Sequence, residues 1–265
     1  MANCCYFAGM NEFWIYVVVC VGAAFAGFID AVVGGGGLVQ VPLLLILFPQ
    51  LSHVQVIATN RFASIAGTSV AAFQYIRSVG IDTTMVLVTG AAAAISSFSG
   101  TFVMKLIAPE VFKPLLLIVI TLLAMYSFLK KDLGKEHSPK YTGTAFLYMA
   151  AGVGAVTGFY NGFIGPGTGT LLVFGFVSVL GMNFLKASAS AKIINAIADA
   201  ASLVGFLLSK SVVFKLAIPM MLSNMLGSYI GSKAAIFKGN KFIRYVFLVV
   251  LILLIARLSW DVFLK

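Results

Sequence analysis

The sequence predicts an all-α, polytopic membrane protein built from two tandem repeats, and three observations support this. The chain is 61% hydrophobic and only 10% charged, whereas soluble domains carry about 25% charged residues. Its apolar runs repeatedly approach the ~20 residues that an α-helix needs to cross a bilayer. When the chain is shifted by 131 residues, it aligns with itself without a gap.

The repeat is indicated by glycines, cations and small residues that fall in register at this offset. Gly34 aligns with Gly165, and Arg61 aligns with Lys192. Each position alone is weak support, but together they indicate an internal duplication. Transporters are commonly built from such repeats.

Each repeat is expected to contain five apolar segments. The first repeat covers residues 1–129, the second covers 142–265, and a polar linker at 130–141 joins them within one membrane domain. The expected segments are 13–33, 38–48, 54–76, 84–107 and 110–129, followed by 144–164, 169–181, 185–208, 212–236 and 241–260.

The second segment of each repeat is too short to cross a membrane. It follows a glycine-rich stretch, Gly34–Gly37 in the first repeat and Gly165–Gly169 in the second. Each Gly costs a helix ~1 kcal/mol relative to Ala, so these stretches are expected to break it. In lipid, broken backbone is tolerated only where protein buries it or a water-filled cavity faces it. Each repeat is therefore expected to form a re-entrant hairpin beside a cavity.

The distribution of cations favours an inverted relation between the repeats. The linker at 130–141 and the segment 233–244 are both rich in lysine, so both are expected on the cytoplasmic side. An odd number of crossings per repeat places both there and leaves the N-terminus outside. The same rule accounts for the net charge of +10, so no nucleic-acid partner is expected.

Two inverted hairpins would bring their glycine stretches together near the membrane midplane, where broken-helix transporters bind substrate. Glycine N–H groups at half-helix N-termini, expected at Leu38 and Gly169, can approach an anion closely. Tight helix crossing is the alternative explanation for the glycines. The substrate-binding residues predicted here are Gly34, Gly35, Gly36, Gly37, Gly165, Gly167, Thr168 and Gly169.

A second set of candidate substrate-binding residues lies at the start of the third segment of each repeat. Arg61 and Lys192 occupy equivalent positions, and a cation inside the membrane costs several kcal/mol unless it is paired or hydrated. An anion site would account for both cations, and snorkelling to the membrane interface is the alternative. Their polar neighbours in these segments are Thr59, Asn60, Ser190 and Asn195.

Two acids are candidates for proton or ion coupling. Asp30 lies one turn before the first glycine stretch, where it could serve as a proton relay or form a salt bridge to Arg61. Asp199 shares a helix face with Lys192, which makes it a candidate partner of that cation. The coupling ion expected is H⁺.

Other chemistries are not indicated. The three cysteines, Cys4, Cys5 and Cys20, have no metal-ligand spacing, and no paired carboxylates or Ser/His/Asp set occurs. We therefore expect no enzyme activity, no metal and no cofactor.

The glycine stretches and the two cationic segments resemble those of the TauE/SafE family of sulfite exporters, also called the 4-toluene sulfonate uptake permease family. The matching stretches are G-F-I-D followed by G-G-G-G and a proline at 27–42, G-F-Y-N-G-F-I-G-P-G-T-G at 158–169, A-T-N-R at 58–61, and A-S-A-K-I-I-N at 189–195. The resemblance covers essentially the whole chain, and the G-P-G-T-G match is specific.

The resemblance implies a multi-pass carrier of the inner or plasma membrane that moves small sulfur-containing anions such as sulfite or sulfonates, as an exporter coupled to an ion gradient. The alternatives are a carrier for another organic acid or a thiol compound, and an anion channel. The chain departs from the family pattern at Asn161, where the family often has Asp, and at Ala198 and Asp199, where it often has Ser and Asn. Both departures fall within the predicted site.

Overall fold

A computed structural model shows an all-helical bundle. It describes residues 12–104 and 137–263, and no strand occurs within these ranges. Three of the described helices are long and apolar enough to cross a membrane, and they span Phe13–Val33, Thr83–Met104 and Phe184–Leu208. The helices are α1 (Glu12–Val33), α2 (Gly36–Leu47), α3 (His53–Ser78), α4 (Thr83–Met104), α6 (Gly143–Phe163), α7 (Thr168–Ser178), α8 (Phe184–Leu208) and α9 (Phe214–Phe263).

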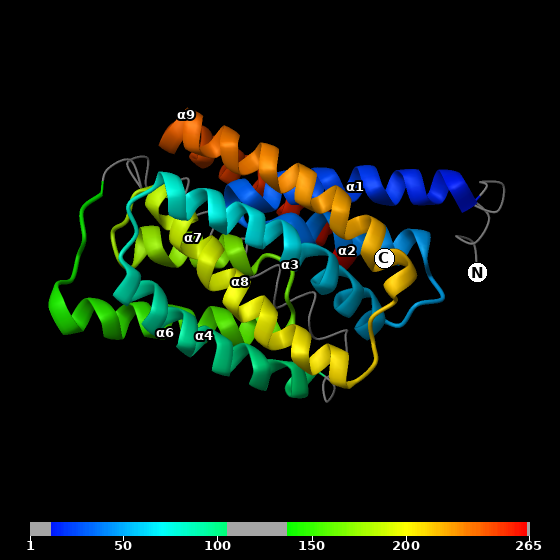
Figure 1. Ribbon diagram of the computed structural model, residues 1–265, viewed down its shortest axis with the longest axis horizontal. Helices are drawn as coiled ribbons and strands as arrows, with labels where there is room; N and C mark the ends of the chain where they lie inside the picture. The colour runs from blue at the N-terminus through cyan, green and yellow to red at the C-terminus, as the bar shows by residue number, and fades with distance from the viewer. Residues whose placement is uncertain (1–11, 105–136, 264–265) are drawn as a thin grey trace.

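The bundle has two ends that carry different loops (Figure 1). At one end, here called the linker end, residues 137–143 lie beside the loops that precede α4 and α8. At the other, here called the N-terminal end, the start of α1 packs near the loop after α2 and the start of α9. The hairpin of α1 and α2 opens at the N-terminal end, and the hairpin of α6 and α7 opens at the linker end (Figure 1). The two hairpins therefore enter the bundle from opposite ends, and the inverted relation of the repeats remains a prediction.

The two predicted helix breaks are confirmed, and glycine backbone geometry explains them. α1 ends at Val33 and α2 begins at Gly36; Gly34 between them has a φ of +85°. Gly165, its counterpart at the 131-residue offset, has a φ of +88°. Residues with a Cβ rarely adopt this left-handed region, so glycine permits the chain to turn back here. With 12 residues, α2 spans about 18 Å, too short to cross the ~30 Å hydrocarbon core.

Small residues allow the helices to approach closely, and the close contacts recur at the same offset. A Cβ on Gly27 in α1 would collide with the backbone oxygen of Asn224 in α9. A Cβ on Gly158 in α6 would likewise collide with the backbone oxygen of Ala93 in α4. The first helix of each half thus packs against a helix of the other half, through the small-residue contacts typical of membrane helices.

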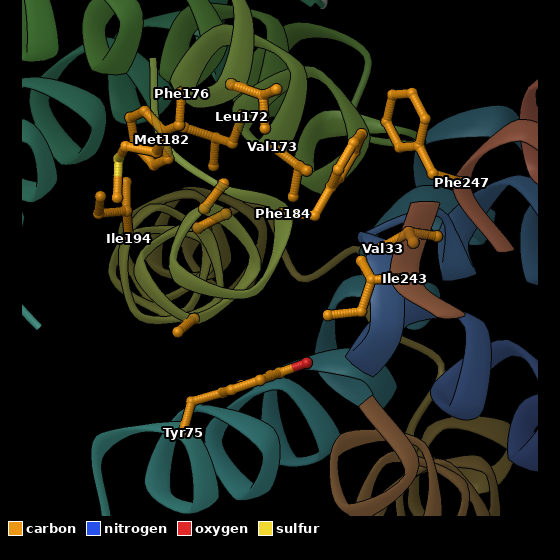
Figure 2. Packing of buried hydrophobic residues seen from close by; sticks show 14 of the residues in the cluster. Val33, Tyr75, Leu172, Val173, Phe176, Met182, Phe184, Ile194, Ile243 and Phe247 are labelled. Carbon is orange, nitrogen blue, oxygen red and sulfur yellow. The ribbon is translucent and has the colours of Figure 1, made fainter. Parts of the chain in front are cut away.

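A buried apolar cluster supports the second hairpin and joins it to α9 (Figure 2). Phe176 of α7 and Ile194 of α8 are fully buried there, as is Phe247 of α9. Tyr75 of α3 lies at the edge of this cluster, and its hydroxyl donates a hydrogen bond to the backbone oxygen of Ala31, 3.0 Å away. This bond ties α3 to the last turns of α1, just before the first helix break.

The observed elements differ from the predicted segments in two places. α2 and α7 begin at Gly36 and Thr168, slightly before the predicted starts, because glycine N-caps let the helices begin within the glycine stretches. The segments predicted at 212–236 and 241–260 lie in one long element, α9, which turns at Gly239 with a φ of +67°. The segment predicted at 110–129 lies outside the described residues.

Candidate functional site

The two glycine stretches meet inside the bundle. We call Gly34–Gly37 the first tip and Gly165–Gly169 the second tip. A Cβ on Gly34 would overlap the backbone of Gly169, and a Cβ on Gly169 would overlap Gly34. The N-termini of α2 and α7 therefore lie against each other, capped by Gly35 and Gly167 rather than by a polar side chain. The predicted meeting of the tips is confirmed.

Arg61 of α3 reaches across to the second half of the chain. Its guanidinium is paired with the carboxylate of Asp199 and donates to the side-chain oxygen of Asn161 at 2.6 Å. It also donates to the backbone oxygen of Asn161 at 2.5 Å, near the end of α6. A cation is favoured there because the C-terminus of a helix carries partial negative charge. Arg61 thus joins α3, α6 and α8 at the second tip.

Lys192 of α8 makes the reciprocal contact with the first half. Its ammonium group lies 2.9 Å from Oδ2 of Asp30, which also accepts a hydrogen bond from Thr68 at 3.2 Å. The other oxygen of Asp30 accepts from the backbone N–H of Gly36 at 3.3 Å, at the start of α2. The first tip therefore already holds an anion, the chain's own carboxylate, at a helix N-terminus where negative charge is stabilised.

These contacts decide between the alternatives left open by the sequence. Snorkelling is wrong, because Arg61 is 5% exposed and Lys192 is 0% exposed. Asp30 does form an ion pair, but with Lys192 rather than Arg61. Asp199 pairs with Arg61 and not with its own helix neighbour Lys192. Each cation therefore pairs with an acid of the opposite half of the chain. The crossing of the helices determines these pairs, not the spacing of residues along one helix.

A small cavity lies between the tips and the ion pairs. Its volume is about 20 Å³, enough for roughly one water molecule. Apart from Pro166, every residue that lines it is polar, charged or a glycine, which is unusual inside an apolar bundle. Its lining residues are Asp30, Gly34, Gly37, Asn60, Arg61, Ser64, Thr68, Asn161, Gly165, Pro166, Gly167, Thr168, Gly169, Asn195 and Asp199.

Some polar atoms around the cavity lack a partner among the described residues. They are Nε of Arg61 and the side-chain oxygens of Asn60 and Asn195. A buried polar group without a hydrogen bond costs about 1–3 kcal/mol of folding free energy. Such groups are therefore rare in native proteins, and each calls for a structural or functional explanation. Here they surround the small cavity, beside the guanidinium of Arg61 and the glycines at the starts of α2 and α7.

Five predicted substrate-binding residues lie outside the cavity lining. Thr59 instead accepts a hydrogen bond from the backbone N–H of Val213 at 3.0 Å and fixes the loop before α9. Gly35 faces Val250 of α9. Gly36 and Lys192 lie behind Asp30 and hold its carboxylate. Ser190 lines a different cavity, at the linker end.

The lining also includes residues that the sequence prediction did not select. Ser64, Thr68 and Asn161 are the counterparts of Asn195, Asp199 and Asp30 at the 131-residue offset. Applying the offset to every candidate would have identified all three. The two halves therefore contribute equivalent positions to the site, but the acid of the first half, Asp30, lies on α1, whereas the acid of the second half, Asp199, lies on α8.

Comparison with known proteins assigns the chain to a family. The family model "Sulfite exporter TauE/SafE" matches residues 19–258, which is most of the chain. This chain belongs to the TauE/SafE sulfite exporter family. No solved structure matches it.

Curated relatives of this TauE/SafE chain are membrane transporters rather than enzymes. "Probable membrane transporter protein YfcA" of Escherichia coli K12 is 31% identical over 240 residues, or 90% of this chain and 87% of the relative. A "Probable membrane transporter protein" of Haemophilus influenzae is 30% identical over 245 residues, or 92% and 94%. ORF9 of a Sinorhizobium species, with the same description, is 31% identical over 251 residues, or 94% of each chain. The chain is accordingly an integral membrane transporter.

The departures from the TauE/SafE pattern at Asn161 and Asp199 form one structural feature. The Asn161 amide donates to Oδ1 of Asp199 at 3.1 Å, and both residues contact Arg61. The resemblance implies Asp at position 161, on α6, and Asn at position 199, on α8, and this chain has the reverse. The carboxylate beside Arg61 therefore comes from α8.

Proposed function

We propose that this protein is a multi-pass secondary carrier of the inner or plasma membrane, acting as an exporter of small sulfur-containing anions such as sulfite or organosulfonates. The observation that carries the proposal is the reciprocal pairing of Arg61 with Asp199 and of Lys192 with Asp30 around two helix N-termini. Two buried cations and two positive helix ends form a site suited to an anion. The family description supplies the substrate class.

Substrate binding in this proposal is an exchange of anions. Asp30 and Asp199 hold the cations while no substrate is present, because a buried unpaired cation costs several kcal/mol. A sulfite or sulfonate group supplies three oxygens that can accept hydrogen bonds from Arg61, Lys192 and tip N–H groups. It would replace one or both carboxylates at the cations and use the unpaired Nε of Arg61.

Charge balance favours coupling to protons. With all four groups ionised, Arg61, Lys192, Asp30 and Asp199 sum to zero charge. A substrate anion would leave the buried site negative unless a proton joined a displaced carboxylate. Neutralisation is the usual response of a buried acid that has lost its partner. One proton is therefore expected to move with each negative charge on the substrate.

Access would alternate between the two ends of the bundle. The cavity holds about one water, so a sulfonate fits only after the tips separate. Because the hairpins open at opposite ends, withdrawal of one hairpin would expose the site to that end while the other remained closed. The cycle thus needs two arrangements of the hairpins around a fixed pair of cations.

A larger cavity at the linker end, lined by the acid Asp82 as well as by Lys186, is a candidate route for an anion. It has a volume of about 490 Å³, and Ser190 at its wall is two residues from Lys192. Lys186 and His137 also line it. Partial burial and then the charge of Lys186 lower the pKa of His137. An anion entering from this end would meet Lys186 before Lys192.

Flux measurements in proteoliposomes test this function. Sulfite and a short alkylsulfonate should be transported, and Arg61→Ala and Lys192→Ala should each lower flux about tenfold or more, because a hydrogen bond to a charged group contributes about 1.5–3 kcal/mol. Lys210→Ala, far from the site, is the matched control and should retain flux. Full flux in both site variants would refute the assignment. Preferred transport of acetate or a thiol compound would refute the substrate class, and flux that does not saturate would indicate a channel.

A further inference from the structure

A lateral groove between α3 and α9 forms a second candidate binding region, separate from the small cavity between the tips. Its volume is about 630 Å³. Gln74 of α3 donates to the backbone oxygen of Tyr229 of α9 at 3.3 Å and holds the two helices together there. The groove walls are mostly apolar, with Val70 and Phe73 from α3 and Met225 from α9.

Two cations lie at one end of this groove. The guanidinium of Arg77 lies 4.1 Å from the centroid of the Phe73 ring, and the ammonium of Lys233 lies 4.3 Å from that of Tyr229. Both cations are exposed. No acid is among the residues that line the groove. Each cation is held beside the groove by its aromatic ring, Arg77 by Phe73 and Lys233 by Tyr229. The N–H groups that do not face the rings can donate hydrogen bonds to an anion.

The polar and apolar parts follow one another along the helices. On α3, Arg77, Phe73, Val70 and Ala66 are spaced by three or four residues and cover about 16 Å of one helix face. On α9, Lys233, Tyr229 and Met225 are spaced by four. The groove thus has a cationic head at the linker end and an apolar continuation toward the middle of the bundle.

We propose that this groove binds an anionic phospholipid. Its phosphate would lie between Arg77 and Lys233, and an acyl chain would follow Val70, Phe73 and Met225 toward the membrane interior. Basic pockets between helices on the cytoplasmic side recognise such headgroups, and only an amphipathic ligand matches both parts of the groove. This site does not depend on the transported substrate.

Lipid binding to the purified full chain tests the proposal. Individual lipid adducts are counted by native mass spectrometry with phosphatidylglycerol and, separately, phosphatidylcholine. The wild type should prefer phosphatidylglycerol, and Arg77→Gln/Lys233→Gln should lower that affinity about fivefold per cation lost. Binding of phosphatidylcholine should not change, and soluble glycerol phosphate should not compete.

The matched control is Lys210→Gln/Lys215→Gln, which removes two cations at the opposite end of the bundle. It should retain the preference for phosphatidylglycerol, and thermal melting should show that both double variants are folded. Equal loss in the two double variants would overturn the proposal, as would equal binding of the two lipids. A wild-type dimer that dissociates in Arg77→Gln/Lys233→Gln would instead identify a second copy as the occupant.

Discussion

At the residue scale, the site depends on how buried cations obtain partners. Arg61 and Lys192 each contact an acid of the opposite half, and each acid is held by a further polar side chain, Asn161 or Thr68. Removing one member of a buried pair costs about 3–5 kcal/mol, since the other charge remains buried. The pairs therefore hold the two halves together when no substrate is bound.

The Asn on α6 and the Asp on α8 that contact Arg61 can be exchanged by mutation. In Asp199→Asn, Arg61 loses its acid, and in Asn161→Asp two carboxylates crowd one cation. Each single variant is expected to lose about 3 kcal/mol of stability and most of its flux. The double variant restores one carboxylate beside Arg61, so it should recover most of both. Thermal melting and sulfonate flux measure this recovery, and losses that simply add in the double variant would contradict it.

At the element scale, the two glycine tips contact each other and bound the small cavity. The two helix breaks were predictable, because a run of glycines cannot remain helical within an apolar segment. The partners of Arg61 and Lys192 were not, because spacing along one helix points to Asp199 for Lys192, while the crossing of α1, α3 and α8 places Asp30 there instead. Ion pairs between helices depend on how the helices pack, and the residue spacing within one helix does not reveal this packing.

A single methyl group at the contact between the tips tests their role. Gly169→Ala would place a Cβ against the backbone of Gly34, so the hairpins could no longer close fully. Flux is expected to fall at least tenfold, whereas the fold survives because only the closed arrangement is disfavoured. The control is Gly152→Ala on α6, where a Cβ meets nothing within 4 Å. Equal flux in the two variants would show that closure of the tips is not required.

At the scale of the whole molecule, most of the cations that the structure describes outside the buried site lie at one end of the bundle. The N-terminal end carries Lys210 and Lys215. At the linker end lie the end of α3, the start of α8 and the turn of α9 near Gly239, and the cations there are Arg77, Lys140, Lys186, Lys233, Lys238, Lys241 and Arg244. By the positive-inside rule we expect the linker end in the cytoplasm; this is the same expectation that the lysines near the linker and near 233–244 gave from the sequence. This orientation would open the α6–α7 hairpin to the cytoplasm and the α1–α2 hairpin to the outside.

Cysteine labelling tests the orientation. In a background in which Cys4, Cys5 and Cys20 are replaced by Ser, Gln50→Cys marks the N-terminal end and Ser138→Cys marks the linker end; both positions are exposed. A membrane-impermeant maleimide should label Gln50→Cys in intact cells and Ser138→Cys only after permeabilisation. The opposite pattern would reverse the direction of every step proposed above.

The central claim is that a transported anion replaces the chain's own carboxylates at Arg61 and Lys192. A structure of the protein with a bound alkylsulfonate tests it most directly. We expect the sulfonate oxygens within hydrogen-bond distance of Arg61 and Lys192, the tips separated, and at least one of Asp30 and Asp199 detached from its cation. A sulfonate bound elsewhere, with both ion pairs intact, would contradict the claim.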